Sequence, residues 1–270
     1  MELNKKRYND LDTYYKKKYE KKIIKLPLDG GFTCPNRDGS ISYRGCIYCS
    51  DLGSGEWTYK SCGDIKNQIA YQKKILSKPG REEGYIAYFQ NFTNTYGDIG
   101  KMRDMFFAAI NEPDIVGLSI ATRADCLPDE VLELLGELNQ KTHLTVELGM
   151  QTVNEDTLKF INRGYNHHEF DLGTQKLHYL GIEVVAHIIV GLVGEDIDDY
   201  LRDISYINYR GIEGIKIHNL YIENNSFLKS YYEKNNISYD MTKDEYANIV
   251  VTMLRHLNPQ VVVNRVTGDG

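Results

Sequence analysis

Long apolar runs are missing from this sequence. Its apolar stretches, such as residues 184–190, are far shorter than the roughly 20 residues that a membrane-spanning helix needs. The first residues, 1–7, are polar and lack the apolar core of a signal peptide. These absences argue against a membrane span and a signal peptide, and they predict a cytoplasmic protein.

Linker-like composition is also missing. No tract rich in Pro, Gly or Ser divides the 270 residues, and there is no internal repeat or low-complexity segment. A chain of this length suffices for one large α/β domain or two small ones. Because nothing in the composition marks a boundary, we expect a single domain.

Positive charge is not in excess. The chain has 32 Lys and Arg residues against 38 Asp and Glu residues, which gives a formal charge of −6. This balance argues against a protein that binds nucleic acid with its whole surface. It leaves room for a local basic patch.

Cysteine is sparse, with five residues, an odd number, and a reducing compartment disfavours disulfides. Three of the five, Cys34, Cys46 and Cys49, lie in one polar, glycine-rich loop with the spacing C-x11-C-x2-C. Cysteines in such a loop are poor candidates for core packing. Their clustering therefore indicates a chemical role for the three cysteines rather than a packing role.

Thiolates at this density are typical of zinc or iron–sulfur sites. Structural zinc normally has four ligands, and Cys62, which could be the fourth, follows a separate polar segment. A 4Fe-4S cluster held by three cysteines leaves one iron open for a substrate or cofactor. The cluster is the favoured reading, and zinc stays open as the minor alternative.

The rest of the chain alternates short β-branched and aromatic runs with longer amphipathic stretches. Pro128 begins one expected helix, Gly181 ends another, and Thr242 with Glu245 forms a capping box. Six successive strand–helix pairs predict parallel strands, in an open doubly wound sheet or a barrel. The expected strands are residues 22–28, 84–90, 115–120, 143–148, 184–190 and 214–221, with a seventh apolar run at 261–266.

The loop after the first expected strand, residues 29–57, is too long to be a simple connection. It holds the three clustered cysteines, and it lies where parallel α/β folds place their chemistry, at the carboxyl ends of the strands. Further motifs follow along the chain. They read LDGGFTCPNRDG at 28–39, AYFQ at 87–90, TNTY at 93–96, DCLPDE at 125–130, VELG at 146–149, QT at 151–152 and TGDG at 267–270.

With these motifs the chain resembles the radical S-adenosylmethionine (SAM) superfamily, in particular its YhcC-like branch, which is related to the radical SAM domain of the Elongator catalytic subunit. The resemblance implies a partial (βα)6 TIM-type barrel in a single domain. It also implies a 4Fe-4S cluster on Cys34, Cys46 and Cys49, whose open iron binds the amino and carboxylate groups of SAM. We expect a basic and aromatic segment at 1–21, then the barrel at 22–270, truncated at the C-terminus because related sequences continue further.

The resemblance also implies a set of SAM contacts. Residues at the end of the second strand stand where superfamily members receive the SAM amino group, although the usual Gly-Gly-Glu-type motif is absent. Gln151 and Arg163 resemble the Gln and Arg that contact SAM in oxygen-independent coproporphyrinogen oxidase, and His187 takes the place of a ribose-contacting carboxylate. Arg163 could instead cap a helix, and His187 could be a core histidine. The full expected set is Gln90, Thr93, Asn94, Thr122, Arg123, Gln151, Arg163 and His187, with no catalytic residue assigned.

The implied activity is reductive cleavage of SAM to a 5′-deoxyadenosyl radical that acts on an unidentified substrate, with flavodoxin or ferredoxin as the reductant. RNA, as a tRNA base, is one expected substrate, since the Elongator-type relatives act on tRNA and the segment from Lys5 to Lys25 mixes lysines with tyrosines. That segment could equally be an ordinary first helix, and a metabolite or peptide substrate is open. The alternative outside enzymes is a zinc- or cluster-binding protein with a structural or redox-sensing role.

Overall fold

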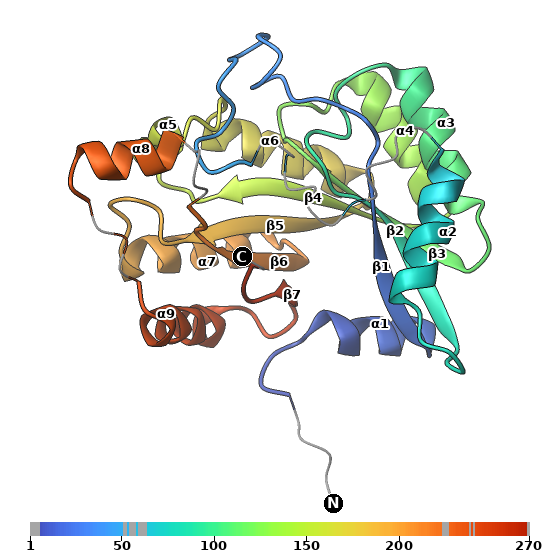
Figure 1. The fold of residues 1–270 in the computed structure, drawn as a ribbon. Helices are drawn as coiled ribbons and strands as arrows, with labels where there is room; N and C mark the ends of the chain where they lie inside the picture. Colours follow the sequence, from blue (N-terminus) through green and yellow to red (C-terminus); the bar gives the residue numbers. More distant parts are fainter. Residues whose placement is uncertain are drawn as a thin grey trace, which may run out of the picture.

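The computed structural model describes residues 6–50, 53, 58, 64–222, 227–237, 239 and 241–268. Within them a single parallel sheet of seven strands follows the chain order from β1 to β7 and curls into a half-barrel, with helices on its outer face (Figure 1). The predicted partial barrel is confirmed. The strands are β1 (Lys22–Leu28), β2 (Glu83–Phe89), β3 (Ile115–Thr122), β4 (His143–Gln151), β5 (Glu183–Val190), β6 (Gly214–Asn219) and β7 (Val262–Arg265).

Each expected strand is present, and the differences are at the ends. β4 runs on to Gln151, three residues past its expected end, through a register shift against β5 after Gly149. β6 stops at Asn219, two residues early. Strands in parallel sheets are covered on both faces, which is why β2 is buried along its whole length.

The outer helices cover the sheet with apolar stripes. In α4 the buried stripe is Val131, Leu134, Leu135 and Leu138, at helical spacing. The expected capping box of Thr242 with Glu245 begins α9, and Pro128 precedes α4 as predicted. None of the described helices has the length and apolarity to span a membrane. The helices are α1 (Leu11–Tyr19), α2 (Ile65–Leu76), α3 (Ile99–Ile110), α4 (Asp129–Asn139), α5 (Glu155–Phe160), α6 (His167–Tyr179), α7 (Ile197–Arg210), α8 (Phe227–Lys234) and α9 (Lys243–His256).

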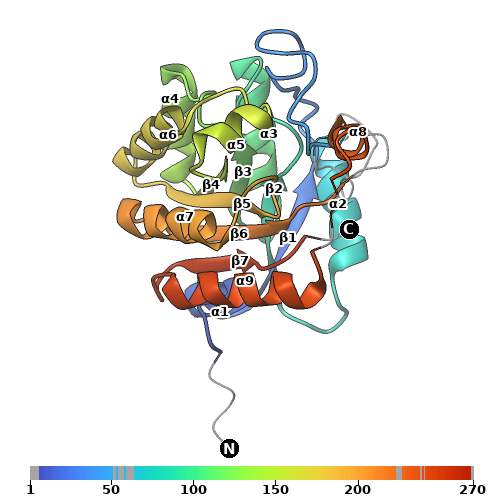
Figure 2. The same cartoon turned by 90° about the vertical axis from the view of Figure 1, so that its left-hand side faces the viewer.

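Helix α1 lies across the amino-terminal edge of the sheet. The Tyr14 hydroxyl donates to Glu183, the first residue of β5, at 2.7 Å, and the Tyr19 hydroxyl lies 2.7 Å from Nδ1 of His143, the first residue of β4. Asp10 forms a parallel bridge with Val263 of β7. Figures 1 and 2 show α1 on the opposite side of the barrel from the loop that follows β1.

Candidate active site

A cavity of about 540 Å³ opens at the carboxyl ends of the strands. Residues of six strands, β2 to β7, line it together with the loop after β1. This is the edge at which parallel α/β barrels place their active sites. The cysteine loop and the polar strand ends therefore share one enclosed space.

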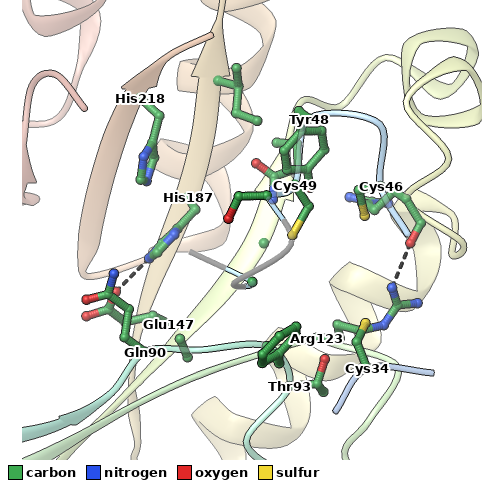
Figure 3. A pocket seen from close by; sticks show the side chains of 18 of the residues that line it. Cys34, Cys46, Tyr48, Cys49, Gln90, Thr93, Arg123, Glu147, His187 and His218 are labelled. Atoms are coloured by element: carbon green, nitrogen blue, oxygen red, sulfur yellow. Dashed lines mark hydrogen bonds and ion pairs between the residues drawn. The ribbon is translucent and has the colours of Figure 1, made fainter. Parts of the chain in front are cut away.

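The loop after β1 brings Cys34, Cys46 and Cys49 to the wall of this cavity (Figure 3). Cys46 and Cys49 sit on one tight turn, in which the Cys49 amide donates to the Cys46 carbonyl at 3.0 Å. The loop is tied to the end of α5, because the Ile47 amide donates to the Ile161 carbonyl at 3.0 Å. The Asn36 side chain donates to the Asn162 carbonyl at 2.6 Å and to the Cys46 sulfur at 3.5 Å.

The surroundings of Cys46 and Cys49 favour neutral thiols over thiolates. Burial raises the pKa of Cys49 to about 12, although Arg37 opposes the shift. Burial also raises the pKa of Cys46, against the lowering effect of Arg123. A bound metal must displace these protons, so loading should depend on pH.

Three thiols that line one cavity are the donor set that a 4Fe-4S cluster with one open iron requires. Within the described residues, no three His, Cys, Asp or Glu side chains converge closely enough to hold one metal ion. A closed zinc site requires such convergence and a fourth ligand, whereas an iron–sulfur cluster is wider and is bound by separate thiolates. Cys62 lies outside the described residues, and Cys126 is buried without joining a second cysteine cluster in the described chain.

Arg163 is almost completely buried beside the cysteine loop, at 1 % exposure. Its guanidinium donates to the carbonyls of Met150 at 2.6 Å and Tyr165 at 3.1 Å, and it lies 4.0 Å from the Tyr165 ring centroid. The remaining nitrogen, Nη2, has no partner among the described residues. Arg163 thus holds the end of β4 and keeps one donor for a ligand, rather than capping a helix.

Arg123 follows β3 and lies next to Arg163. Its Nε and Nη2 donate to the Asp125 carboxylate at 2.9 and 2.7 Å, and its Nη1 donates to the Arg163 carbonyl at 2.7 Å. Arg123 lines the cavity, but its charge is already balanced by Asp125.

Gln151 ends β4 with a positive φ of 66°, a conformation that is uncommon for a residue other than glycine. The strand shifts register here, and a Cβ at Gly149 would meet the Gln151 amide nitrogen at 2.7 Å. Gly149 therefore makes room for the Gln151 side chain beside the cavity that both residues line. A strained backbone conformation at a cavity wall is typical of a functional position.

Gln90, Thr93 and Thr122 also line the cavity, as the predicted set requires. Asn94 is not among the lining residues. Its amide donates to the carbonyls of Phe89, Asn91 and Ala121 at 2.9 to 3.1 Å, so it fastens the loop after β2 to the end of β3. A direct contact of Asn94 with SAM stays a prediction.

Glu147 is the centre of a polar network inside the barrel, which the sequence analysis did not identify. Its carboxylate is 1 % exposed. Burial alone would raise the pKa of Glu147, but Lys216, Lys25 and His187 outweigh it and hold the pKa well below its usual value. The carboxylate accepts from Lys25, from Ser119 at 2.9 Å, from Tyr88 at 2.9 Å, from His187 at 2.6 Å and from Lys216 at 3.2 Å.

His187 belongs to this network and lines the cavity. Burial and the nearby Lys216 lower its pKa to about 4, so the neutral imidazole donates its Nε2 proton to Glu147. The His218 ring lies 5.1 Å from the His187 ring, and Arg265 donates to Nδ1 of His218 at 2.7 Å. One signal could have revealed Lys216 and His218, since they alternate with isoleucines along β6 and so face the interior.

Comparison with known proteins identifies the family. The model of the Radical SAM superfamily matches residues 38–207, and the model of the Radical_SAM C-terminal domain matches residues 212–270. The uncharacterized protein YtqA of Bacillus subtilis (strain 168) is 40% identical over 265 residues, covering 98% of this chain and 82% of YtqA. Protein YhcC of Escherichia coli (strain K12) is 35% identical over 254 residues, covering 94% of this chain and 81% of YhcC.

Among solved structures, the archaeal Methanocaldococcus infernus Elp3 with an N-terminal deletion superposes with a TM-score of 0.62 at 17% identity. The match covers 91% of this chain and 56% of the Elp3 chain, so this chain spans little more than half of Elp3, and the likeness shows the fold. The motifs of the cysteine loop predict this family, and the family models, the two relatives and the half-barrel fold all agree with that prediction. The chain belongs to the radical SAM superfamily, with YtqA and YhcC as relatives, and it is a radical SAM enzyme.

Proposed function

We propose that this enzyme binds a 4Fe-4S cluster through Cys34, Cys46 and Cys49 and uses it to cleave SAM into methionine and a 5′-deoxyadenosyl radical. One observation carries the proposal. The three cysteines line the same cavity as the polar residues that end β3, β4 and β5, and family membership implies both cofactors. When bound, the cluster supplies the electron that breaks a carbon–sulfur bond of SAM.

The residues of the chain would bind and orient SAM. The unpartnered Nη2 of Arg163 and the amide of Gln151 lie on the cysteine side of the cavity and offer donors to the carboxylate or hydroxyl oxygens of SAM. Tyr48, Phe92 and Ile189 line the same space with apolar surface. Such surface excludes water from a reactive intermediate, which is the part of the chemistry that the protein supplies.

A protein reductant such as flavodoxin or ferredoxin would deliver the electron. Tyr43, at 82% exposed, and Ile41, at 47% exposed, project from the cysteine loop. They offer a docking surface close to the cysteines. A cytoplasmic location stays a prediction.

RNA is the substrate class that we propose to test first, on the resemblance to the Elongator catalytic subunit. The tyrosines of the basic segment do not add to this case. Tyr15 is buried at 5% exposure, and Tyr14 and Tyr19 are bonded to Glu183 and His143. Lys5 lies outside the described residues, and the exposed lysines belong to α1, which lies on the opposite side of the barrel from the loop after β1 (Figure 1). These contacts are the ones expected if residues 11–19 form an ordinary first helix that packs on the barrel.

The test is anaerobic reconstitution with iron and sulfide, followed by incubation with SAM and a strong reductant. The expected protein is brown and releases 5′-deoxyadenosine slowly without added substrate. A colourless protein that holds zinc would support the non-catalytic alternative. Intact SAM in the presence of a confirmed, reduced cluster would contradict the proposed function.

A further inference from the structure

The cavity carries an excess of positive charge that the protein as a whole does not have. Among the described residues that line it, Glu147 is the single carboxylate, although the chain as a whole is acidic. The cavity is partly enclosed, so its charges are weakly screened and act strongly on a ligand. The cations that line it are Arg37, Arg123, Arg163, Lys216 and Arg265.

The arginines on the cysteine side are already engaged. Arg123 is paired with Asp125, and Arg163 donates to two backbone carbonyls. Arg37 donates to the Cys49 carbonyl at 3.1 Å and to the Ser50 carbonyl. Beyond what they already bind, these residues face the thiolates of the proposed cluster.

The cations on the other side share one counter-charge. Lys216 lies 3.2 Å from the Glu147 carboxylate, which also pairs with Lys25. Arg265 bonds to the neutral His218 ring and is in no ion pair with a described residue. The Glu147 carboxylate therefore pairs with Lys25 and Lys216, and the charge of Arg265 has no counter-ion among the described residues.

His218 adds an unused donor. Arg265 is always a donor, so Nδ1 of His218 accepts, and in the neutral ring the proton sits on Nε2. Burial lowers the pKa of His218 well below its usual value, which keeps the ring neutral. Neither Nε2 of His218 nor Nε of Arg265 has a partner in the described structure, and both atoms are buried. Buried donors are normally paired, so these two require an acceptor that the described residues do not supply.

The histidine of this set lies apart from Cys34 and Cys46 in the cavity. Figure 3 shows His187 and His218 on one side, and Cys34 and Cys46 on the other. Lys216 and His218 are on β6 and Arg265 ends β7, whereas the cysteine loop is tied to α5. A ligand group bound at β6 and β7 would thus lie apart from Cys34 and Cys46, beside His187, the expected contact of the SAM ribose.

We infer that the substrate carries an anionic group, a carboxylate or a phosphate, that binds between Lys216, His218 and Arg265. The inference rests on the proposed function, because it assigns the cysteine side of the cavity to SAM. Two cations and a neutral N–H donor form a set that suits either oxyanion. Glu147 holds Lys216 in place and limits the net charge of the site.

Equilibrium dialysis of the full chain tests this inference. The protein carries a reconstituted cluster and saturating SAM, without reductant, and the probes are radiolabelled orthophosphate and radiolabelled acetate at constant ionic strength. We expect one saturable site for at least one probe. Lys216→Met and Arg265→Gln should each weaken binding by about tenfold or more, because each removes a charge-assisted hydrogen bond. The matched controls, Lys159→Met and Arg103→Gln on the exposed surface, should bind like the wild type.

Glu147→Gln should change the affinity for anions in the opposite direction. It removes the one negative charge and keeps the side-chain shape, so anion binding should become several-fold tighter. Arg265→Gln decides the question if Lys216→Met or Glu147→Gln fails to fold, because Arg265 is in no ion pair with a described residue. Binding of phosphate alone would indicate a phosphate-bearing substrate, and binding of acetate alone a carboxylate-bearing one.

Three results would overturn the inference. They are the absence of saturable binding in the wild type, equal binding in Arg265→Gln and its control, and displacement of the anion by SAM. Release of 5′-deoxyadenosine is measured on the same samples after adding reductant. Anion binding without SAM cleavage would count against the proposed function alone, and SAM cleavage without anion binding would count against the inference alone.

Discussion

His187 donates to the carboxylate of Glu147 at 2.6 Å across the interior of the barrel, from β5 to β4. The same carboxylate accepts from Lys25 of β1 and Lys216 of β6. A single buried anion thus joins strands at opposite ends of the sheet. Because its partners are themselves charged or buried, the network is sensitive to the loss of any member.

Loss of the Glu147 charge and side chain should destabilise the fold. Glu147→Ala leaves Lys25 and Lys216 without their counter-ion at side-chain exposures of 18% and 12%, so we expect a loss of about 3–5 kcal/mol in the free energy of unfolding. Urea unfolding monitored by circular dichroism measures it. Glu137→Ala, which breaks the exposed pair with Arg103, should cost less than about 1 kcal/mol. Equal effects of the two substitutions would contradict the structural role given to Glu147.

Each of the three loop cysteines should be required for the cluster. Cys34→Ala, Cys46→Ala and Cys49→Ala each leave one cluster iron without its protein ligand, so iron and sulfide content after reconstitution should collapse. Cys126→Ala and Cys62→Ala serve as controls and should load fully. A full complement of iron and sulfide in Cys46→Ala would refute the ligand assignment.

Gln151 should contribute to SAM affinity. Gln151→Ala removes a polar side chain from the cavity wall, and we expect SAM to bind roughly tenfold more weakly to the reconstituted protein. Asn139→Ala is the comparison, because Asn139 donates to the Leu180 and Gly181 carbonyls and does not line the cavity. It should lower thermal stability more than SAM affinity. Unchanged SAM affinity in Gln151→Ala would remove Gln151 from the site.

Glu195 should make stability depend on pH. Burial raises its pKa to about 7 despite the hydroxyls of Thr152 and Thr157, whereas in the unfolded chain it titrates near 4.5. A raised carboxyl pKa means that the folded state holds the proton more tightly. The stabilisation is therefore complete below pH 4.5 and is lost as the pH rises to about 7, amounting to at most about 3 kcal/mol.

Glu195→Gln should remove this dependence. Urea unfolding at several pH values between 4.5 and 8 should show a shallower decline in the variant than in the wild type. The matched control is Glu133→Gln, on the exposed face of α4, which should follow the wild-type profile. Parallel profiles for Glu195→Gln and wild type would show that Glu195 does not titrate in this range.

If the basic face of α1 binds tRNA, the contact should be electrostatic. Charge reversal of Lys16, Lys17 and Lys18 should abolish most binding of bulk tRNA at low salt, and wild-type binding should fall steeply as salt rises. Lys159→Glu, an exposed lysine elsewhere, is the control. No measurable binding to wild type at low salt, with an unchanged nucleoside profile in a deletion strain, would remove RNA from the candidate substrates.

The sequence by itself determined the alternation of strands and helices, and its cysteine pattern predicted the ligand set. Apolar runs separated by amphipathic segments leave few arrangements other than a parallel sheet, since each strand must be covered on both faces. The cysteine cluster could be recognised from the sequence because C-x11-C-x2-C is a local pattern within one loop. Some of the expected SAM contacts lie at strand ends or within a strand, and the topology predicts that they share one cavity. Four of them line it, namely Gln90, Thr93, Gln151 and His187.

Only the tertiary structure decided which polar groups meet inside the barrel. Lys25, Glu147 and Lys216 are separated by more than 60 residues from one another, and their contact depends on how the sheet curls. The same holds for α1, whose tyrosines bond to the first residues of β4 and β5 rather than to a ligand. A local pattern gives each residue's element and face, but the partner of a buried charge is set by which strands the closed fold brings side by side.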